Sequence, residues 1–212
     1  MTFLPEIVAA TRRKVRACRS GADLREMERQ AEAHVPRGFR KKLETASRSG
    51  IAVIAELKKA SPSRGLIRGN FDASSLAGEL EQAGAAALSV LTDEEFFSGS
   101  LANLRAASEQ TQLPCLRKDF IVDEFQVLEA RANCADAVLL IAAALSQEEL
   151  LMLAKKAREL HLDALCEVHD EEELGRALDA GCDLIGVNSR NLQTFQVDLG
   201  TAFRIAPSIP PG

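Results

Sequence analysis

The sequence predicts a protein of the α/β class with a parallel sheet, and three observations support this. Short apolar runs recur along the 212 residues, and segments with helical spacing lie between them. The runs are almost continuously apolar rather than alternating, which is typical of strands buried on both faces. Strands that alternate with helices are joined by right-handed crossover connections, and therefore lie parallel to one another.

The first 48 residues differ from the rest, because they show helical patterns and no strand. Two or three helices are expected there, over residues 4–19, 22–33 and 38–47. We interpret residues 1–48 as an N-terminal helical extension rather than an independent domain. Residues 49–212 form the repeating part.

Six strands and the helices that link them are expected in the repeating part. Ser146 with Glu149 three residues later is a capping box, Asp170 opens another helix, and Gly84 and Gly181 are stop signals. The strands cover residues 51–57, 85–91, 113–120, 135–141, 163–169 and 182–189, and the helices 72–84, 101–109, 123–133, 146–161 and 170–181.

Two architectures fit this order of elements: an open doubly wound sheet and a (β/α) barrel. A doubly wound dinucleotide-binding fold carries a glycine-rich turn after an early strand. Here the first strand continues into "ELKKASPSRG", and no G-x-G-x-x-G or Walker A sequence occurs. The barrel is therefore favoured.

Composition excludes several classes of function. The net charge of −5 and the pI near 5.4 argue against a general nucleic-acid binder, and the chain has nine Phe but no Trp or Tyr for base stacking. No apolar stretch is long enough to span a bilayer, and no signal-peptide core is present. We expect a cytoplasmic protein without a membrane or nucleic-acid partner.

The five cysteines do not form a C-x-x-C pair, so reduced and mostly buried thiols are expected. Cys166 and His169 in "CEVH" have the spacing of a metal-ligand pair. The sequence offers no second pair at a matching spacing, so no metal site is predicted.

Polar residues follow four of the six strands at the point where each strand ends. Because the carboxyl ends of parallel strands meet at one edge, these side chains are expected to converge there. One charged strand end is usually a salt bridge at the rim, but four favour a functional site. The residues are Glu56 and Lys58, then Arg117, Lys118 and Asp119, then Glu167, and finally Asn188, Ser189 and Arg190.

This residue set indicates a chemistry. Neighbouring lysines and glutamates suit general acid and base catalysis, and lysine and arginine bind phosphate or carboxylate. A lysine that forms a Schiff base, as in aldolases, is an alternative. The expected substrate is an anionic, phosphorylated small molecule that undergoes proton transfers.

Five motifs in order resemble the indole-3-glycerol phosphate synthase family: "IAELKKASPSRG", "SVLTDEEFFSGS", "LPCLRKDFIVDEFQV", "CEVHDEEEL" and "IGVNSRNLQTFQVD". The resemblance implies a (β/α)8 TIM barrel and a lyase of tryptophan biosynthesis. Its substrate would be 1-(2-carboxyphenylamino)-1-deoxyribulose 5-phosphate. The reaction would close the indole ring with loss of carbon dioxide and water, and would use no cofactor or metal.

The resemblance also implies roles for particular residues. Lys118 matches the general acid that protonates the substrate carbonyl, and Glu167 matches the carboxylate of the later proton transfers. Lys58 matches a lysine that helps dehydration. Glu56 matches a carboxylate that orients Lys58. Asn188 and Arg190 match residues at polar groups of the substrate, and Ser61 matches a serine near its anthranilate carboxylate. Phe96, Phe97 and Phe120 either line an aromatic pocket or pack in loops.

The resemblance implies eight βα units, and six are found. The sequence reaches "SIPPG" where a seventh strand is expected, so the chain is expected to lack strands seven and eight and their phosphate-binding loops. A full-length form is expected to be a monomer, and this chain alone to be inactive and to self-associate. Two alternatives stay open: another phosphate-binding barrel enzyme, and a non-catalytic barrel fragment.

Overall fold

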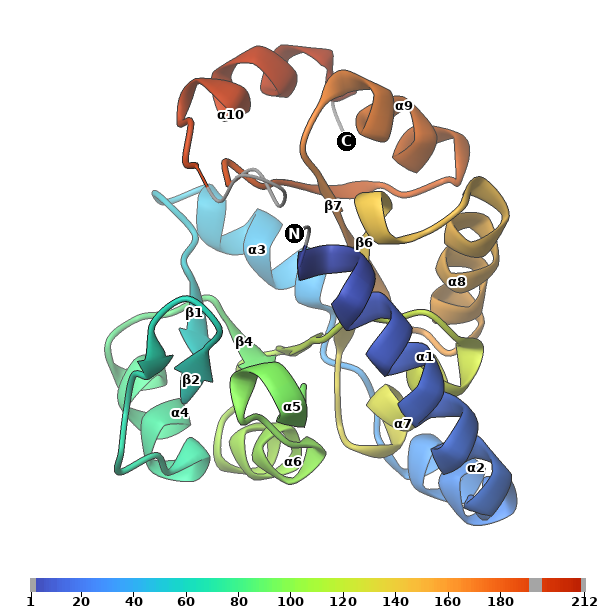
Figure 1. Ribbon diagram of the computed structural model, residues 1–212. Coiled ribbons are helices and arrows are strands. Elements are labelled where there is room, and N and C mark those ends of the chain that lie inside the picture. The colour runs from blue at the N-terminus through green and yellow to red at the C-terminus, as the bar shows by residue number, and fades with distance from the viewer. Residues whose placement is uncertain (1–2, 191–195, 211–212) are drawn as a thin grey trace.

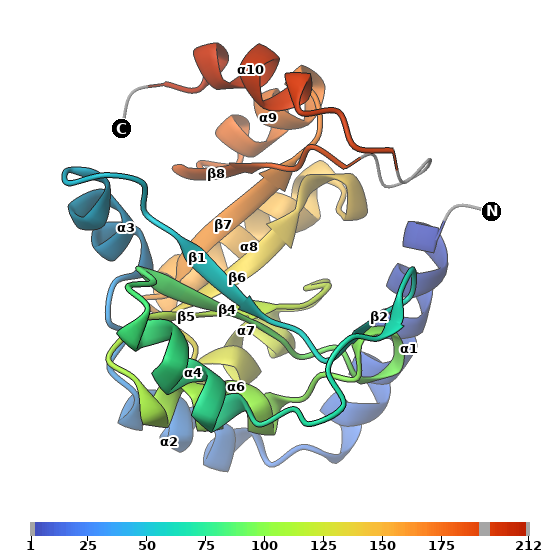
Figure 2. The ribbon, with the colours of Figure 1, turned by 90° about the vertical axis from the view of Figure 1, so that its left-hand side faces the viewer.

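The computed structural model describes residues 3–190 and 196–210, so residues 191–195 of the last motif lie outside the described residues. Six strands form one curved sheet in the order β1-β4-β5-β6-β7-β8 (Figures 1 and 2). All neighbouring pairs are parallel, which confirms the predicted class and the six predicted strands. They are β1 Ile54–Leu57, β4 Ala87–Leu91, β5 Cys115–Lys118, β6 Ala137–Ile141, β7 Asp163–Val168 and β8 Leu184–Val187.

The helices also follow the predicted order and surround the sheet (Figure 1). The extension contains α1 Phe3–Gly21, α2 Leu24–Ala33 and α3 Phe39–Ser47, and the linking helices are α4 Ala73–Gln82, α6 Leu101–Gln110, α7 Glu124–Ala132, α8 Gln147–Glu159 and α9 Glu171–Asp179. The sequence did not predict the hairpin of β2 Ala60–Ser61 and β3 Gly65–Leu66, the short helices α5 Glu94–Phe97 and α10 Gly200–Ile205, or the 3-10 turns Ala142–Ala144 and Ala206–Ser208.

Helix ends are fixed by the residues that the sequence indicated. The capping box of α8 is present, with Glu149 N donating to Ser146 Oγ over 3.2 Å and Ser146 N donating to Glu149 Oε2 over 2.9 Å. Asp170 caps α9. Gly84 and Gly181 have φ of 89° and 73°, a left-handed conformation that glycine adopts without steric cost.

The prediction that every strand is buried on both faces is wrong at the edges of the sheet. The central strands β4 and β6 are buried throughout, but β1 is largely open and β8 is only half-buried. Both have a single strand neighbour within the described residues. Apolar runs at an edge and at the centre look alike in the sequence, because only pairing separates them.

Alternate residues of the strands pack into two clusters on opposite sides of the sheet. Val138 and Leu140 of β6 belong to the large cluster beneath the surrounding helices. Leu139 and Ile141 face the inner side, where Phe39 of α3 is fully buried against them. The extension therefore covers the part of the inner face around Phe39, and Lys118 and Glu167 lie outside this cluster.

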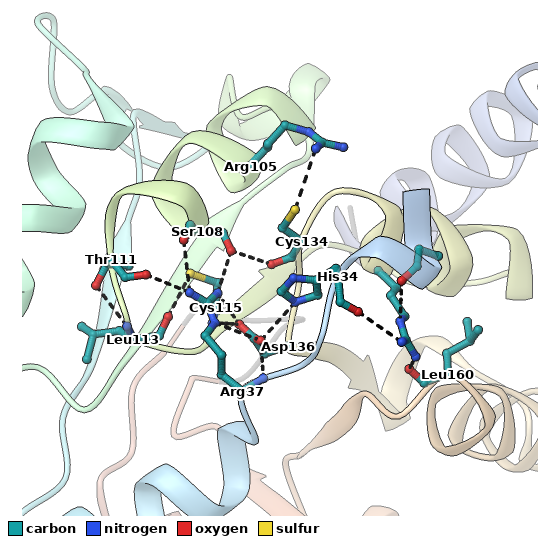
Figure 3. Close-up of polar contacts among 12 residues, drawn as sticks. His34, Arg37, Arg105, Ser108, Thr111, Leu113, Cys115, Cys134, Asp136 and Leu160 are labelled. Carbon is teal, nitrogen blue, oxygen red and sulfur yellow. Dashed lines mark hydrogen bonds and ion pairs between the residues drawn. The ribbon is translucent and has the colours of Figure 1, made fainter. Parts of the chain in front are cut away.

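A polar network holds the segment between α2 and α3 against the sheet (Figure 3). The carboxylate of Asp136 is fully buried and accepts hydrogen bonds from Arg37 N over 2.7 Å and from Cys115 N over 2.7 Å. His34 Nε2 lies 3.2 Å from the same carboxylate, and Arg37 Nη1 donates to the Thr111 carbonyl over 2.9 Å. The extension thus contacts the sheet through charged groups as well as through Phe39.

None of the helices among the described residues combines the length and the apolar character that a membrane crossing needs.

Candidate active site

The register of the sheet places the predicted side chains on its inner face. Leu116 is part of the inner cluster, so Lys118, two residues later, points to the same side. Leu165 packs against that cluster and precedes Glu167 by two residues in β7. Leu184 of β8 also packs against the inner cluster, and Asn188, four residues later, is expected to lie on the same side of the sheet. Three separate strands therefore deliver polar groups to one place.

Glu167 is the centre of this group. Its Oε1 accepts a hydrogen bond from Asn188 Nδ2 over 3.0 Å, and its Oε2 lies 3.9 Å from Lys118 Nζ. The Glu167 side chain is 13% exposed and the Lys118 side chain 29% exposed. A partly exposed lysine that is paired with a shielded carboxylate can exchange protons with a bound molecule.

Lys58 and Glu56 lie at the end of β1 and form an ion pair with each other. Their spacing of two residues places both on one side, as the sequence predicted. Lys58 also lines the cavity described next, whereas Glu56 lines a neighbouring hollow with Lys58.

A cavity of about 420 Å³ collects most of the predicted binding residues. The rings of Phe97 and Phe120 have their centroids 6.3 Å apart on one of its walls, a separation within the range of aromatic contacts. Phe96 lines a different cavity beneath α1. The lining residues that had been predicted are Lys58, Ser61, Phe97, Phe120 and Arg190.

The sequence reasoning did not assign other residues of the cavity to the site. Arg64 adds a third cation to those of Lys58 and Arg190. It belongs to "ELKKASPSRG" after the first strand, and its charge was the signal that could have identified it. Leu4 and Ile7 come from α1, and nothing in an amphipathic helix marks which apolar residues cover a site.

Because side chains alternate between the two faces of a strand, Arg117 and Asp119 point to the opposite side of the sheet from Lys118. Arg117 is buried and lies 3.1 Å from Asp119 and 2.9 Å from Glu129 of α7. Thr92 Oγ1 donates to Asp119 over 2.6 Å. This buried network joins β5 to α7 and is structural, so the polar end of this strand contributes Lys118 to the site.

His169 and Cys166 do not lie together at a metal site. His169 hydrogen-bonds Glu173 through Nδ1 over 2.9 Å, while Cys166 is buried on the helix side of the sheet. The five cysteines are free thiols. Within residues 3–190 and 196–210, no three potential metal ligands of the His, Cys, Asp and Glu types are grouped.

The arrangement combines three kinds of group at one edge of the sheet. Cations line the cavity and suit an anionic ligand. Two lysine–glutamate pairs stand at the strand ends and can move protons. Phenylalanine rings provide an apolar wall for a flat ring system. Such a site fits a small molecule that carries both an aromatic ring and negative charges.

Comparison with protein families gives a match over nearly the whole chain. The family model described as indole-3-glycerol phosphate synthase matches residues 4–212. A curated relative of that name from Koribacter versatilis is 57% identical over 208 residues, which are 98% of this chain and 80% of the relative. A relative of the same name from Chlorobium chlorochromatii is 46% identical over 99% of this chain and 82% of the relative. Another from Desulfotalea psychrophila is 48% identical over 98% of this chain and 80% of the relative.

These alignments run over nearly the whole chain and do not support the expectation that it is shortened. Solved structures give a more distant likeness. A complete multifunctional pyruvate carboxylase from Rhizobium etli has a TM-score of 0.51 at 16% identity, over 74% of this chain and 18% of that chain. The carboxyl transferase domain of pyruvate carboxylase from the same organism has a TM-score of 0.50 at 16% identity. The likeness covers 74% of this chain and 31% of the chain in that structure. At this identity the likeness concerns the fold alone.

Proposed function

The chain belongs to the indole-3-glycerol phosphate synthase family, and we propose that the side chains gathered at the carboxyl end of its sheet perform the reaction. The family consists of carboxy-lyases of tryptophan biosynthesis that act on a phosphorylated small molecule. The observation that carries the proposal is the convergence of Lys118, Glu167 and Asn188 from three strands beside a cationic, phenylalanine-lined cavity.

Lys118 is the general acid of the first step. Its ammonium group gives a proton to the substrate carbonyl oxygen while the aromatic ring carbon attacks the carbonyl carbon. A carbon–carbon bond forms, the carbonyl becomes a hydroxyl group, and loss of carbon dioxide restores the aromatic ring. The open position of Lys118 supports this role.

Dehydration follows and needs an acid and a base. Lys58 protonates the hydroxyl group that leaves as water, and Glu167 accepts the proton that the ring system gives up. Glu56 holds Lys58 in place through their ion pair. Asn188 holds the Glu167 carboxylate through its hydrogen bond, so both partners are oriented before the substrate binds.

Substrate binding uses the remaining residues of the site. Ser61 and Arg190 contact polar groups, with Ser61 near the anthranilate carboxylate, and the rings of Phe97 and Phe120 pack against the aromatic ring. The lining of the cavity by all four supports these assignments. We further propose a cytoplasmic location, no nucleic-acid partner, and a monomeric full-length form.

The test compares two proteins. One is the 212-residue chain, and the other is a chimera that adds the part of the Koribacter relative outside the aligned residues. Each is mixed with 1-(2-carboxyphenylamino)-1-deoxyribulose 5-phosphate, and indole fluorescence is followed. We expect product from the chimera, and the chain alone is measured in parallel because its described sheet is open at β1 and β8. A chimera that folds and forms no product contradicts the proposal.

A further inference from the structure

His169 occupies a fixed position beside the candidate site. It follows β7 and stands two residues after Glu167. Glu173, in the first turn of α9, accepts hydrogen bonds from both His169 N and Nδ1 over 2.9 Å at the same oxygen. Asp170 in turn accepts from Glu173 N over 2.8 Å. The start of α9 therefore holds the imidazole through two contacts and leaves Nδ1 as the proton-bearing nitrogen.

The other imidazole nitrogen faces the candidate site. Nε2 lies 3.7 Å from Glu167 Oε1, the oxygen that also accepts from Asn188. Nε2 is buried and has no hydrogen-bond partner among the described residues. Leaving a buried polar atom unpaired costs about 1–3 kcal/mol, so an atom of this kind needs an explanation.

The charges around His169 favour its protonated form. Carboxylates face it from three residues, Glu167 on β7 and Asp170 and Glu173 at the start of α9, and Lys118 on β5 faces Glu167 from the other side. Burial lowers the pKa of His169, but the hydrogen bond to Glu173 and the nearby carboxylates together raise it above its usual value. In that form Nε2 carries a proton directed at Glu167.

We propose that His169 is a positioning residue for Glu167, held by Glu173 and presenting a positive charge to the Glu167 carboxylate. The inference rests on the proposed role of Glu167 in proton transfer. With Lys118 and Asn188 it gives Glu167 donors on several sides, so the orientation of the carboxylate is fixed when the substrate arrives. The alternative is that Glu173 only caps α9 and His169 has no link to the reaction.

The first test measures the coupling between His169 and Glu167 without catalysis. Protein labelled with ¹⁵N-histidine is titrated by NMR, and the three imidazoles, His34, His161 and His169, are followed separately. Glu167→Gln is expected to lower the pKa of His169 by about one unit. Glu171→Gln, an exposed neighbour in α9, is the control and is expected to leave it within about 0.3 unit. A His169 pKa that does not respond to Glu167→Gln overturns the proposal.

The second test separates positioning from helix capping. Glu173→Gln keeps an oxygen that accepts both hydrogen bonds but removes the charge, so the fold is retained. In the chimera, His169→Gln and Glu173→Gln are each expected to lower kcat about tenfold and to change KM less than about twofold. His161→Asn, at an exposed residue in a left-handed turn, is expected to change neither.

The outcomes of the two tests distinguish a failure of the positioning role from a failure of the proposed function. Unchanged kcat in both His169→Gln and Glu173→Gln overturns the positioning role even if the imidazole responds in the titration. If the parent chimera forms no product, the proposed function fails, and the titration still decides whether His169 is coupled to Glu167. If His169→Gln does not fold, as judged by circular dichroism, Glu173→Gln decides the kinetic test.

Discussion

Arg117 and Lys118 are neighbours in the sequence but belong to opposite sides of the sheet. Arg117 is buried in a network with Asp119 and Glu129, whereas Lys118 reaches the candidate site beside Glu167. The sequence predicted that a cation would stand at the end of this strand. The motif of the family resemblance, rather than charge or spacing, identified which of the two cations it is.

Arg117→Ala is therefore expected to act on stability. It leaves the carboxylates of Asp119 and Glu129 shielded without their cation, at a cost of about 3–5 kcal/mol in the free energy of unfolding. Lys118→Ala is expected to change that free energy by less than about 1 kcal/mol, because its ion pair is long and open to solvent. Urea unfolding of both variants checks this, and equal losses would show that the two residues have been assigned to the wrong sides.

A Schiff base on either lysine is not expected. Lys58 is paired with Glu56 and Lys118 lies beside Glu167, and in the proposed reaction each lysine donates a proton rather than acting as a nucleophile. Treatment of the chimera with substrate and borohydride should leave its mass unchanged. An adduct on Lys58 or Lys118 would support the aldolase alternative.

Among the elements, the helices and central strands were predictable because their signals are local. The capping box of α8, the cap at Asp170 and the stop glycines all lie within a few residues of the ends they fix. The contact between His34 and Asp136, which anchors the extension to the sheet and is called the anchor below, was not predictable. His34 and Asp136 are 102 residues apart, and no local pattern pairs a histidine in a loop with a carboxylate before a strand.

The anchor makes a prediction about pH. Burial lowers the pKa of His34, but its contact with Asp136 outweighs this and raises that pKa to about 9. In the unfolded chain it is about 6.5, so the folded state binds the proton more tightly. This stabilisation is complete below about pH 6.5 and is lost as the pH rises through about 9.

Urea unfolding between pH 6 and 10 measures this effect. The free energy of unfolding is expected to fall by about 1–3 kcal/mol over the window, and the fall is expected to be smaller in His34→Gln. His161→Asn, at an exposed histidine, serves as the control and should retain the full fall. A His34→Gln variant with the same pH dependence as the parent would mean that the anchor does not titrate in this range.

At the scale of the whole molecule, the six described strands form an open sheet with β1 at one edge. Ile51 is 94% exposed and Val53 is 51% exposed beside that edge. An apolar edge strand without a blocking charge readily pairs with another chain. The sequence showed this liability, since "IAVIAEL" has no charge before Glu56.

The 212-residue chain is thus expected to self-associate at micromolar concentration. Val53→Lys places a charge beside the edge and is expected to increase the monomer fraction measured by light scattering. Arg48→Lys, at an exposed residue outside the strand, is a control that keeps the charge. A parent chain that is already a monodisperse monomer would show that the edge is not exposed in solution.

The most direct measurement of the central claim is the turnover of the chimera carrying Lys118→Ala or Lys59→Ala. Lys118 lies beside Glu167, whereas Lys59 stands one residue after Lys58 and is therefore expected to point away from the site. Removal of the general acid is expected to lower kcat by at least about 100-fold, whereas Lys59→Ala is expected to change it less than about threefold. Comparable losses in the two variants would contradict the assignment of Lys118 as the acid and of this edge of the sheet as the active site.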